Sequence, residues 1–210
     1  MSARQNRFSF CPCPGFLNVE NMDIFNHHIP PGTQRVFIGI PIDKQSQQQI
    51  NELLKPIKDS RRDIRWVPEN NRHLTLAFLG NRPISEVDNL IRLFDESYQQ
   101  ETRFQYRLST LERFPDPTGR IIALTNEPDE SLDKLFQITL KLLQRNEVEF
   151  DRKKFRPHVT LGRIRRPKHV NKTFEKQINI NLDITKITLY QSRLTDSGSI
   201  YSALKETLLI

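Results

Sequence analysis

Hydrophobic residues along this chain form two patterns, a helical spacing and short apolar runs, which alternate from segment to segment. A helical spacing, with apolar residues three and four apart, occurs over residues 43–57, 85–94 and 129–146. Short runs rich in apolar and β-branched residues predict strands between these helices. The predicted strands cover residues 35–40, 64–67, 73–79, 104–111, 121–124, 158–164, 178–182, 184–190 and 201–208.

Turn and capping residues mark the boundaries of these elements. Pro68-Glu-Asn-Asn71 predicts a turn between two strands, and Pro115-Asp-Pro-Thr-Gly119 predicts a hairpin turn. Ser85, with an acid three residues later, predicts the N-cap of the second helix. Residues 1–33 contain four prolines and no sustained period, so we expect a disordered N-terminal extension followed by one domain over residues 34–210.

One short motif occurs twice, as His73-Leu-Thr75-Leu and as His158-Val-Thr160-Leu. On a strand, side chains two apart share a face, so each motif presents an imidazole beside a hydroxyl. A single such pair is usually a hydrogen-bonded surface feature, whereas two copies with apolar residues at all four intervening positions are not expected by chance. Each copy follows a predicted helix, which indicates two similar lobes related by an approximate twofold axis.

The side chains of the two motifs suit the opening of a 2′,3′-cyclic phosphate if they converge. One histidine can take a proton from water while the other gives a proton to the departing ribose oxygen, because imidazole titrates near neutral pH. Thr75, Thr160 and Arg163 are candidates to hold the phosphate oxygens, with Arg163 at or just past the end of its strand. The residues alone leave open which histidine is the acid.

Composition and charge narrow the class of protein. The chain has 36% hydrophobic and 27% charged residues, and no apolar run approaches the ~20 residues that cross a bilayer. We therefore expect a cytoplasmic protein with no membrane partner. The net charge is +7, and residues 152–176 hold ten Lys or Arg against one acid, Glu175. This run indicates a polyanionic partner, the alternative being a solvated basic face without a ligand.

Other chemistries find less support in the sequence. The chain contains no Gly-x-Ser-x-Gly nucleophile motif and no glycine-rich phosphate loop. Cys11 and Cys13 with His27-His28 can be drawn as a metal site, yet this spacing matches no familiar zinc pattern. Threonine at the second polar position of both histidine motifs is a poor metal ligand. We expect neither a metal nor another cofactor.

Ordered sequence blocks between Arg35 and about Leu204 resemble the 2H phosphoesterases, a family named for two histidine motifs. The blocks are Arg35-Val-Phe-Ile-Gly-Ile, Trp66-Val-Pro-Glu-Asn-Asn-Arg-His-Leu-Thr-Leu-Ala-Phe-Leu-Gly80, Phe114-Pro before Arg120, Phe155-Arg-Pro-His-Val-Thr-Leu-Gly-Arg163, and Leu189-Tyr-Gln-Ser-Arg-Leu194 followed by Gly198 and Tyr201. Within the family, the chain resembles the bacterial and archaeal RNA 2′,3′-cyclic phosphodiesterases, also described as 2′-5′ RNA ligases.

This resemblance implies a bilobal α+β fold in which two antiparallel sheets and flanking helices surround a central cleft. It implies hydrolysis of an RNA terminal 2′,3′-cyclic phosphodiester to a 2′-phosphomonoester without a metal. By motif position it makes His73 the proton donor and His158 the proton acceptor. It also makes Thr75, Thr160 and Arg163 contacts to the substrate phosphate. The substrate would be an RNA or a nucleotide with a 2′,3′-cyclic phosphate end.

Two alternative functions use the same residues. A non-catalytic RNA-binding module would keep both motifs but lose the reaction, and a 2′-5′ RNA ligase or phosphodiesterase would act on internal linkages with an RNA hydroxyl in place of water.

Trp66 and Phe155 are candidates to stack on a nucleobase, although aromatic residues beside strands are more often packing groups. Tyr201 could reach the phosphate or close the core. We expect a monomer.

Overall fold

The computed structural model describes residues 29–150, 154–165, 175–195 and 198–210, and within them it contains nine strands, three α-helices and one 3-10 turn. In chain order the elements are β1 (Thr33–Pro41), α1 (Lys44–Ser60), β2 (Ile64–Trp66), η2 (Glu69–Asn71), β3 (His73–Pro83), α2 (Ile84–Tyr98), β4 (Phe104–Phe114), β5 (Ile121–Thr125), α3 (Glu130–Arg145), β6 (His158–Ile164), β7 (Lys176–Ile184), β8 (Lys186–Thr195) and β9 (Gly198–Leu208).

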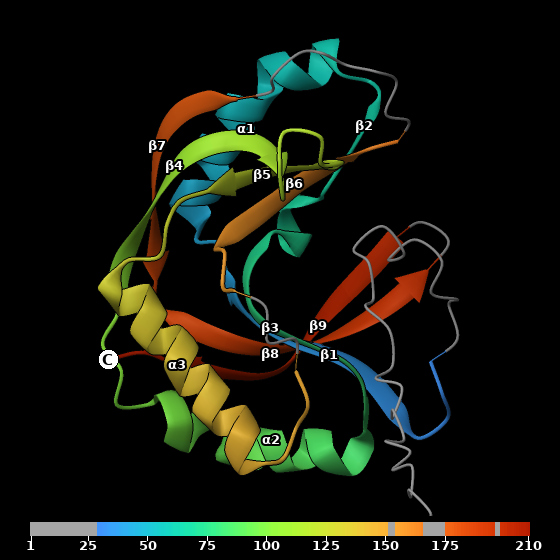
Figure 1. The fold of residues 1–210 in the computed structure, drawn as a ribbon, viewed down its shortest axis with the longest axis vertical. Coiled ribbons are helices and arrows are strands. Elements are labelled where there is room, and N and C mark those ends of the chain that lie inside the picture. The colour runs from blue at the N-terminus through green and yellow to red at the C-terminus, as the bar shows by residue number, and fades with distance from the viewer. Residues whose placement is uncertain (1–28, 151–153, 166–174, 196–197) are drawn as a thin grey trace, which may run out of the picture.

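The described strands form one antiparallel sheet that divides into two halves (Figure 1). The upper half in Figure 1 contains β7, β4, β5 and β6, with β2 paired to β6, and the lower half contains β3, β1, β8 and β9. A single residue pair, Leu74 on β3 and Val159 on β6, joins the halves, and both side chains are fully buried. The two predicted sheets are therefore halves of one sheet, connected at the two histidine motifs.

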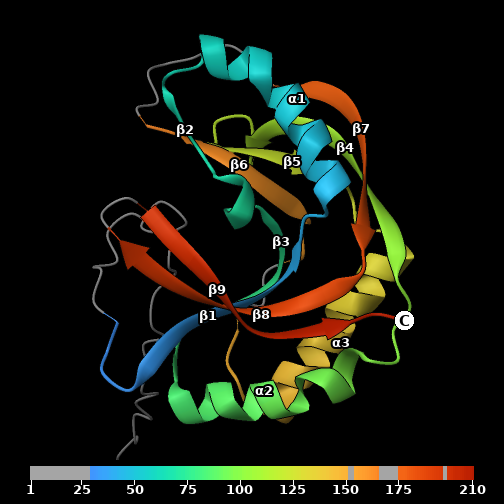
Figure 2. The same cartoon turned by 180° about the vertical axis from the view of Figure 1, so that it is seen from behind.

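The helices cover the outer side of each half, as both views show (Figures 1 and 2). Helix α1 lies along the upper half next to β7, and α2 and α3 pack together beneath the lower half. Each helix turns its apolar stripe to the sheet, as the helical spacing predicts; α2, for example, buries Val87, Leu90 and Phe94. A buried hydrogen bond of 2.9 Å between the hydroxyls of Tyr98 and Thr139 links α2 to α3.

Aspartate side chains start two of the helices. Asp43 Oδ1 accepts a 2.9 Å hydrogen bond from the Ser46 amide of α1, and Asp129 caps α3 in the same way. The predicted cap of the second helix is wrong, because α2 begins at Ile84 and Ser85 lies in its first turn. Pro83, whose ring fixes its backbone angle φ, takes the N-cap position and makes no side-chain cap. The first amide of the helix, that of Ile84, donates to the carbonyl of Gly32.

The α+β prediction is confirmed, and most predicted strands and helices occur within a few residues of their expected bounds. The contact of Gly32 with Ile84 shows that the last residues of the expected extension belong to the fold. The rest of that extension, residues 1–28, lies outside the described residues. None of the helices in the described part of the chain is both long and apolar enough to cross a membrane.

Candidate active site

Four of the predicted site residues lie on one face of the sheet, where its halves meet. Leu74 and Val159 are direct partners across β3 and β6, and both point into the core. Because side chains alternate along a strand, the flanking residues of each motif point to the opposite face. In this antiparallel register His73 lies next to Thr160, and Thr75 lies next to His158. Two imidazoles and two hydroxyls thus come together.

The two imidazole rings are held in the same way. Nδ1 of His73 lies 2.8 Å from the carbonyl oxygen of Asn71, and Nδ1 of His158 lies 2.9 Å from that of Arg156. A carbonyl can only accept, so each Nδ1 carries a hydrogen. In each ring Nε2 is therefore the atom that can take a proton or, once protonated, give one.

Three aromatic rings surround His73. The centroid of Phe37 lies 4.6 Å from that of the imidazole, and Tyr190 lies 6.0 Å away. Tyr201 meets the imidazole edge-on at 5.2 Å. Burial among these rings is the main cause that lowers the pKa of His73 to about 4; the positive charge of His158 contributes to the lowering, and the hydrogen bond to the carbonyl of Asn71 opposes it. The electrostatic influence of one imidazole on the other agrees with their placement on one face.

His158 has a more open surrounding. Its ring stacks on Phe114 with centroids 4.1 Å apart, and the guanidinium of Arg156 lies over the same phenyl ring. Burial lowers the pKa of His158, and the positive charge of Arg156 lowers it as well, against a hydrogen bond that raises it. A cavity of about 240 Å³ is lined by Phe114 and Arg156; Thr125, which lies opposite His158 on β5, and Glu112 are also part of its wall.

The two threonine hydroxyls are available to a ligand. Both side chains are half-buried, and neither hydroxyl has a hydrogen-bond partner among the residues that the structure describes. Hydroxyl groups in this position can donate to the oxygens of a bound phosphate.

Arg163 reaches the same face through an irregularity in β6. We expected Arg163 at or past the end of its strand, but β6 continues to Ile164. In a regular strand, Arg163 and Thr160 would point to opposite faces. Arg163 is the partner of Ile121 and Thr160 is the partner of Ala123, so β6 contains one extra residue between them. This β-bulge turns Arg163 to the face of the histidines.

The sequence alone assigned no role to the phenyl rings that contact the histidines. Phe37 and Phe114 both lie in blocks that carry the family resemblance. The sequence predicted Phe37 as a strand residue and placed Phe114 between a predicted strand and a turn. It could not predict their contacts with the histidines, because these depend on which strands become neighbours. Each histidine takes one phenyl ring from a different strand, β1 for His73 and β4 for His158.

The candidate stacking residues are packing groups in this fold. Phe155 stacks on Phe136 of α3 at 4.1 Å, and both Trp66 and Phe155 pack against the core. The sequence left open whether Tyr201 reaches the phosphate or closes the core. In the structure its ring contacts the imidazole of His73.

The alternative metal site cannot be located here, because Cys11, Cys13 and His27-His28 lie outside the described residues, as does His169 in the basic run. Within the described ranges, no three His, Cys, Asp or Glu side chains come together as a metal-binding group.

Solved structures share this fold. A protein of Thermus thermophilus superimposes with a TM-score of 0.73 at 24% identity, covering 83% of this chain and 97% of its own. Escherichia coli LigT, solved in complex with 3′-AMP, gives a TM-score of 0.70 at 24% identity and covers 84% of this chain and 98% of its own. At this level of identity the likeness concerns the fold.

Sequence relatives extend over most of the chain. The RNA 2′,3′-cyclic phosphodiesterase of Thermotoga maritima is 27% identical over 179 residues, which cover 82% of this chain and 94% of the relative. The protein of the same name from Aquifex aeolicus is 28% identical over 184 residues, covering 83% and 97%. The family model described as LigT like phosphoesterase matches residues 40–123 and again residues 122–201, so each match contains one histidine motif. The chain belongs to the LigT-like phosphoesterase family, which confirms the resemblance that its sequence blocks indicated.

Proposed function

We propose that this protein hydrolyses the terminal 2′,3′-cyclic phosphodiester of RNA to a 2′-phosphomonoester, with His73 as the proton donor and His158 as the proton acceptor. The observation that carries the proposal is the pair of imidazoles on one sheet face, each with Nδ1 bonded to a backbone carbonyl. The shared name of the Thermotoga and Aquifex relatives, RNA 2′,3′-cyclic phosphodiesterase, supports the same substrate class.

The reaction needs one proton taken and one given. Nε2 of His158 takes a proton from water as the water oxygen attacks phosphorus. The bond between phosphorus and the ribose 3′ oxygen breaks, and the imidazolium of His73 gives its proton to that oxygen. The phosphate stays on the 2′ oxygen, so the product carries a 2′-phosphomonoester and a free 3′-hydroxyl. Exchange of one proton with solvent at each ring restores the starting state.

Extra negative charge develops on the non-bridging phosphate oxygens during this attack. The hydroxyls of Thr75 and Thr160 and the guanidinium of Arg163 share the face of the two imidazoles. Hydrogen bonds from such donors to a charged oxygen stabilise it by roughly 1.5–3 kcal/mol each. We assign these three residues to the phosphate oxygens.

The donor role of His73 depends on bound substrate. With its pKa lowered to about 4 by burial, His73 is neutral at neutral pH in the free protein. A cyclic phosphodiester is an anion, and an anion next to an imidazole favours the protonated ring and raises its pKa. Binding of substrate therefore supplies the charge that keeps the acid protonated. Burial lowers the pKa of both rings, so the direction of the pKa shift does not distinguish the acid from the base. We therefore assign the two roles by the order of the motifs in the family.

A 2′-5′ RNA ligase or phosphodiesterase is a second candidate function. The cavity of about 240 Å³ favours it, because its wall includes Phe114, the ring that stacks on His158. His158 is the proposed base, and the attacking oxygen lies on its side of the phosphorus. An RNA 5′-hydroxyl in place of water would bring a nucleoside, and the cavity offers room for one. Product analysis with a 5′-hydroxyl RNA present, looking for a new 2′-5′ linkage, tests this candidate.

Turnover of 2′,3′-cyclic AMP in EDTA, followed by phosphorus NMR, tests the main proposal. We expect complete conversion to the 2′-phosphomonoester. A 3′-phosphomonoester product would mean that the other ribose oxygen leaves, and would contradict the role given to His73. Binding of RNA that weakens with salt but yields no turnover would instead identify a non-catalytic RNA-binding module.

The proposal includes a monomer that works in the cytoplasm. One chain supplies both histidines and all three proposed phosphate contacts, so the reaction needs no second copy. Light scattering of the purified protein under assay conditions is expected to give the mass of one chain. A dimer that loses activity on dilution would contradict this part.

A further inference from the structure

Arg65 lies beside Arg163 on the face of the sheet that carries the histidine motifs. The Cα atoms of the two arginines are partners across the antiparallel pair of β2 and β6. The next pair, Ile64 and Ile164, is buried in the core at 4% and 2% exposure, so both arginines point the other way. Direct cross-strand partners hold their Cβ atoms about 5 Å apart. The two side chains therefore extend the positive charge of the site from β6 to β2.

The side chain of Arg65 extends from the upper half of the sheet to the lower half. Its Nη2 lies 2.6 Å from the position that a Cβ would take on Gly198, the first residue of β9. Gly198 has a φ of +135°, which glycine adopts without strain. Nearby, the side-chain amide of Asn71 donates a 2.7 Å hydrogen bond to the carbonyl of Ser199. The guanidinium is thus seated where β2 and β9 approach each other.

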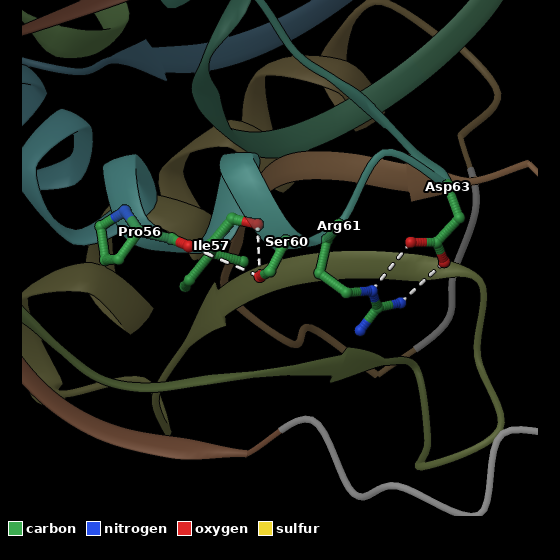
Figure 3. A network of polar contacts seen from close by, with 5 residues as sticks. All are labelled: Pro56, Ile57, Ser60, Arg61 and Asp63. Carbon is green, nitrogen blue, oxygen red and sulfur yellow. Dashed lines mark hydrogen bonds and ion pairs between the residues drawn. The ribbon is translucent and has the colours of Figure 1, made fainter.

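Hydrogen bonds hold the segment between the end of α1 and β2, the strand that carries Arg65 (Figure 3). The guanidinium of Arg61 donates through Nε and Nη2 to the two carboxylate oxygens of Asp63, each at 2.8 Å. The hydroxyl of Ser60 donates to carbonyls in the last turn of α1, and the carbonyl of Asp63 accepts from the Arg165 amide at 2.9 Å. These bonds hold the end of α1 against β6 and so set the position of β2.

We propose that Arg65 forms a second phosphate subsite, which binds the internal phosphodiester that precedes the cyclic end of an RNA chain. This inference rests on the proposed function, in which Arg163 contacts the reacting phosphate. An RNA backbone carries one phosphate per nucleotide, so arginines on adjacent strands suit successive phosphates. The planar guanidinium fork also matches phosphate oxygens better than an ammonium does. The preferred substrate is then an oligoribonucleotide, since a mononucleotide has no phosphate for Arg65.

Two substrates that differ by one internal phosphodiester test this subsite. One is 2′,3′-cyclic AMP, and the other is a diadenosine that ends in the same cyclic phosphate. For the wild type we expect a higher kcat/KM on the dinucleotide. Arg65→Gln is expected to lower kcat/KM on the dinucleotide by about ten- to a hundredfold, the range of a lost hydrogen bond to a charged group. On the mononucleotide its kcat/KM stays unchanged.

Two further variants separate charge from position. Arg65→Lys keeps the charge without the fork, so it is expected to fall between wild type and Arg65→Gln on the dinucleotide. Arg193→Gln is the matched control. Arg193 is exposed on β8, and it follows Ser192, the cross-strand partner of Tyr201, so its side chain points to the face opposite Tyr201. It should leave both substrates unaffected. Equal losses on the two substrates for Arg65→Gln, or no loss on either, would overturn the subsite.

A binding measurement keeps the subsite testable if the proposed function fails. If the wild type hydrolyses neither substrate, the affinities of the adenosine 2′-phosphate and of the diadenosine with a 2′-phosphate end replace the rates. Arg65→Gln should weaken only the dinucleotide, and should make the slope of log K against log salt shallower by about 0.7. Equal affinity of wild type and variant for the dinucleotide would overturn the subsite independently of catalysis.

Discussion

The surroundings of His73 and His158 differ in how closely the protein encloses each ring. Both rings donate from Nδ1 to a carbonyl two residues earlier, and each contacts one phenylalanine ring, tilted for His73 and stacked for His158. His73 has two tyrosine rings in addition, whereas His158 is close to the positive charge of Arg156, which lines a polar cavity together with Phe114. One sequence motif thus yields the same tautomer twice in two different environments. The motif fixes which nitrogen of each ring is bonded to the backbone, and the packing around the ring sets its proton affinity.

Loss of either imidazole should give the largest effect. His73→Ala and His158→Ala are each expected to lower kcat on 2′,3′-cyclic AMP by about a thousandfold, within the usual range of general acid–base catalysis. The double variant should be little worse, because the two rings act as a unit. Thermal unfolding of each variant controls for loss of fold. If both single variants kept wild-type kcat, the comparison of the two rings would have no bearing on catalysis.

Variants of the proposed phosphate contacts should give the next largest loss of activity. Arg163→Gln removes a charged donor and is expected to lower kcat/KM by about a hundredfold. Thr75→Val and Thr160→Val remove only a hydroxyl, and we expect about tenfold from each. Similar losses from the two threonines would mean that both halves hold the phosphate alike. Steady-state kinetics on the mononucleotide decides this, and full activity of Arg163→Gln would remove Arg163 from the site.

The smallest predicted effect concerns the rings around His73. Tyr201→Ala opens one side of this imidazole, so the burial that lowers its pKa is reduced and the pKa of His73 should rise. The pKa of His158 should stay where it is. Tyr201→Phe keeps the ring and serves as the control, with both pKa values unchanged. NMR titration of the imidazole protons measures both; equal shifts of the two histidines in Tyr201→Ala would contradict separate environments.

Much of this architecture follows from the local pattern of the sequence. The helical spacing in residues 43–57 and 129–146 predicted α1 and α3, which begin after aspartate caps. Alternation within each histidine motif predicted the shared face of imidazole and hydroxyl, because side-chain direction along a strand depends on the backbone alone. The proline before Ile84 shows the limit of such rules. There a distant carbonyl, that of Gly32, satisfies the first amide in place of the serine cap.

Features that depend on contacts between strands could not be predicted in this way. The direction of Arg163 comes from an extra residue in β6, which only the register against β5 reveals. The rings beside His73 come from β1, β8 and β9, far apart in the chain. The approach of Arg65 to Gly198 likewise joins the two halves of the sheet. Each of these features involves residues that are distant in sequence and adjacent in the fold.

The pH dependence of kcat/KM on 2′,3′-cyclic AMP tests the central claim most directly, because it reports the acid and the base of the free enzyme. Burial lowers both histidine pKa values, so the wild-type profile should be bell-shaped with its optimum below pH 6.5, the usual value for histidine. The residual activity of His158→Ala should only fall as pH rises, because its acid remains, and that of His73→Ala should only rise. A wild-type profile without limbs, or a variant that keeps both limbs, would contradict an acid and base pair at these two positions.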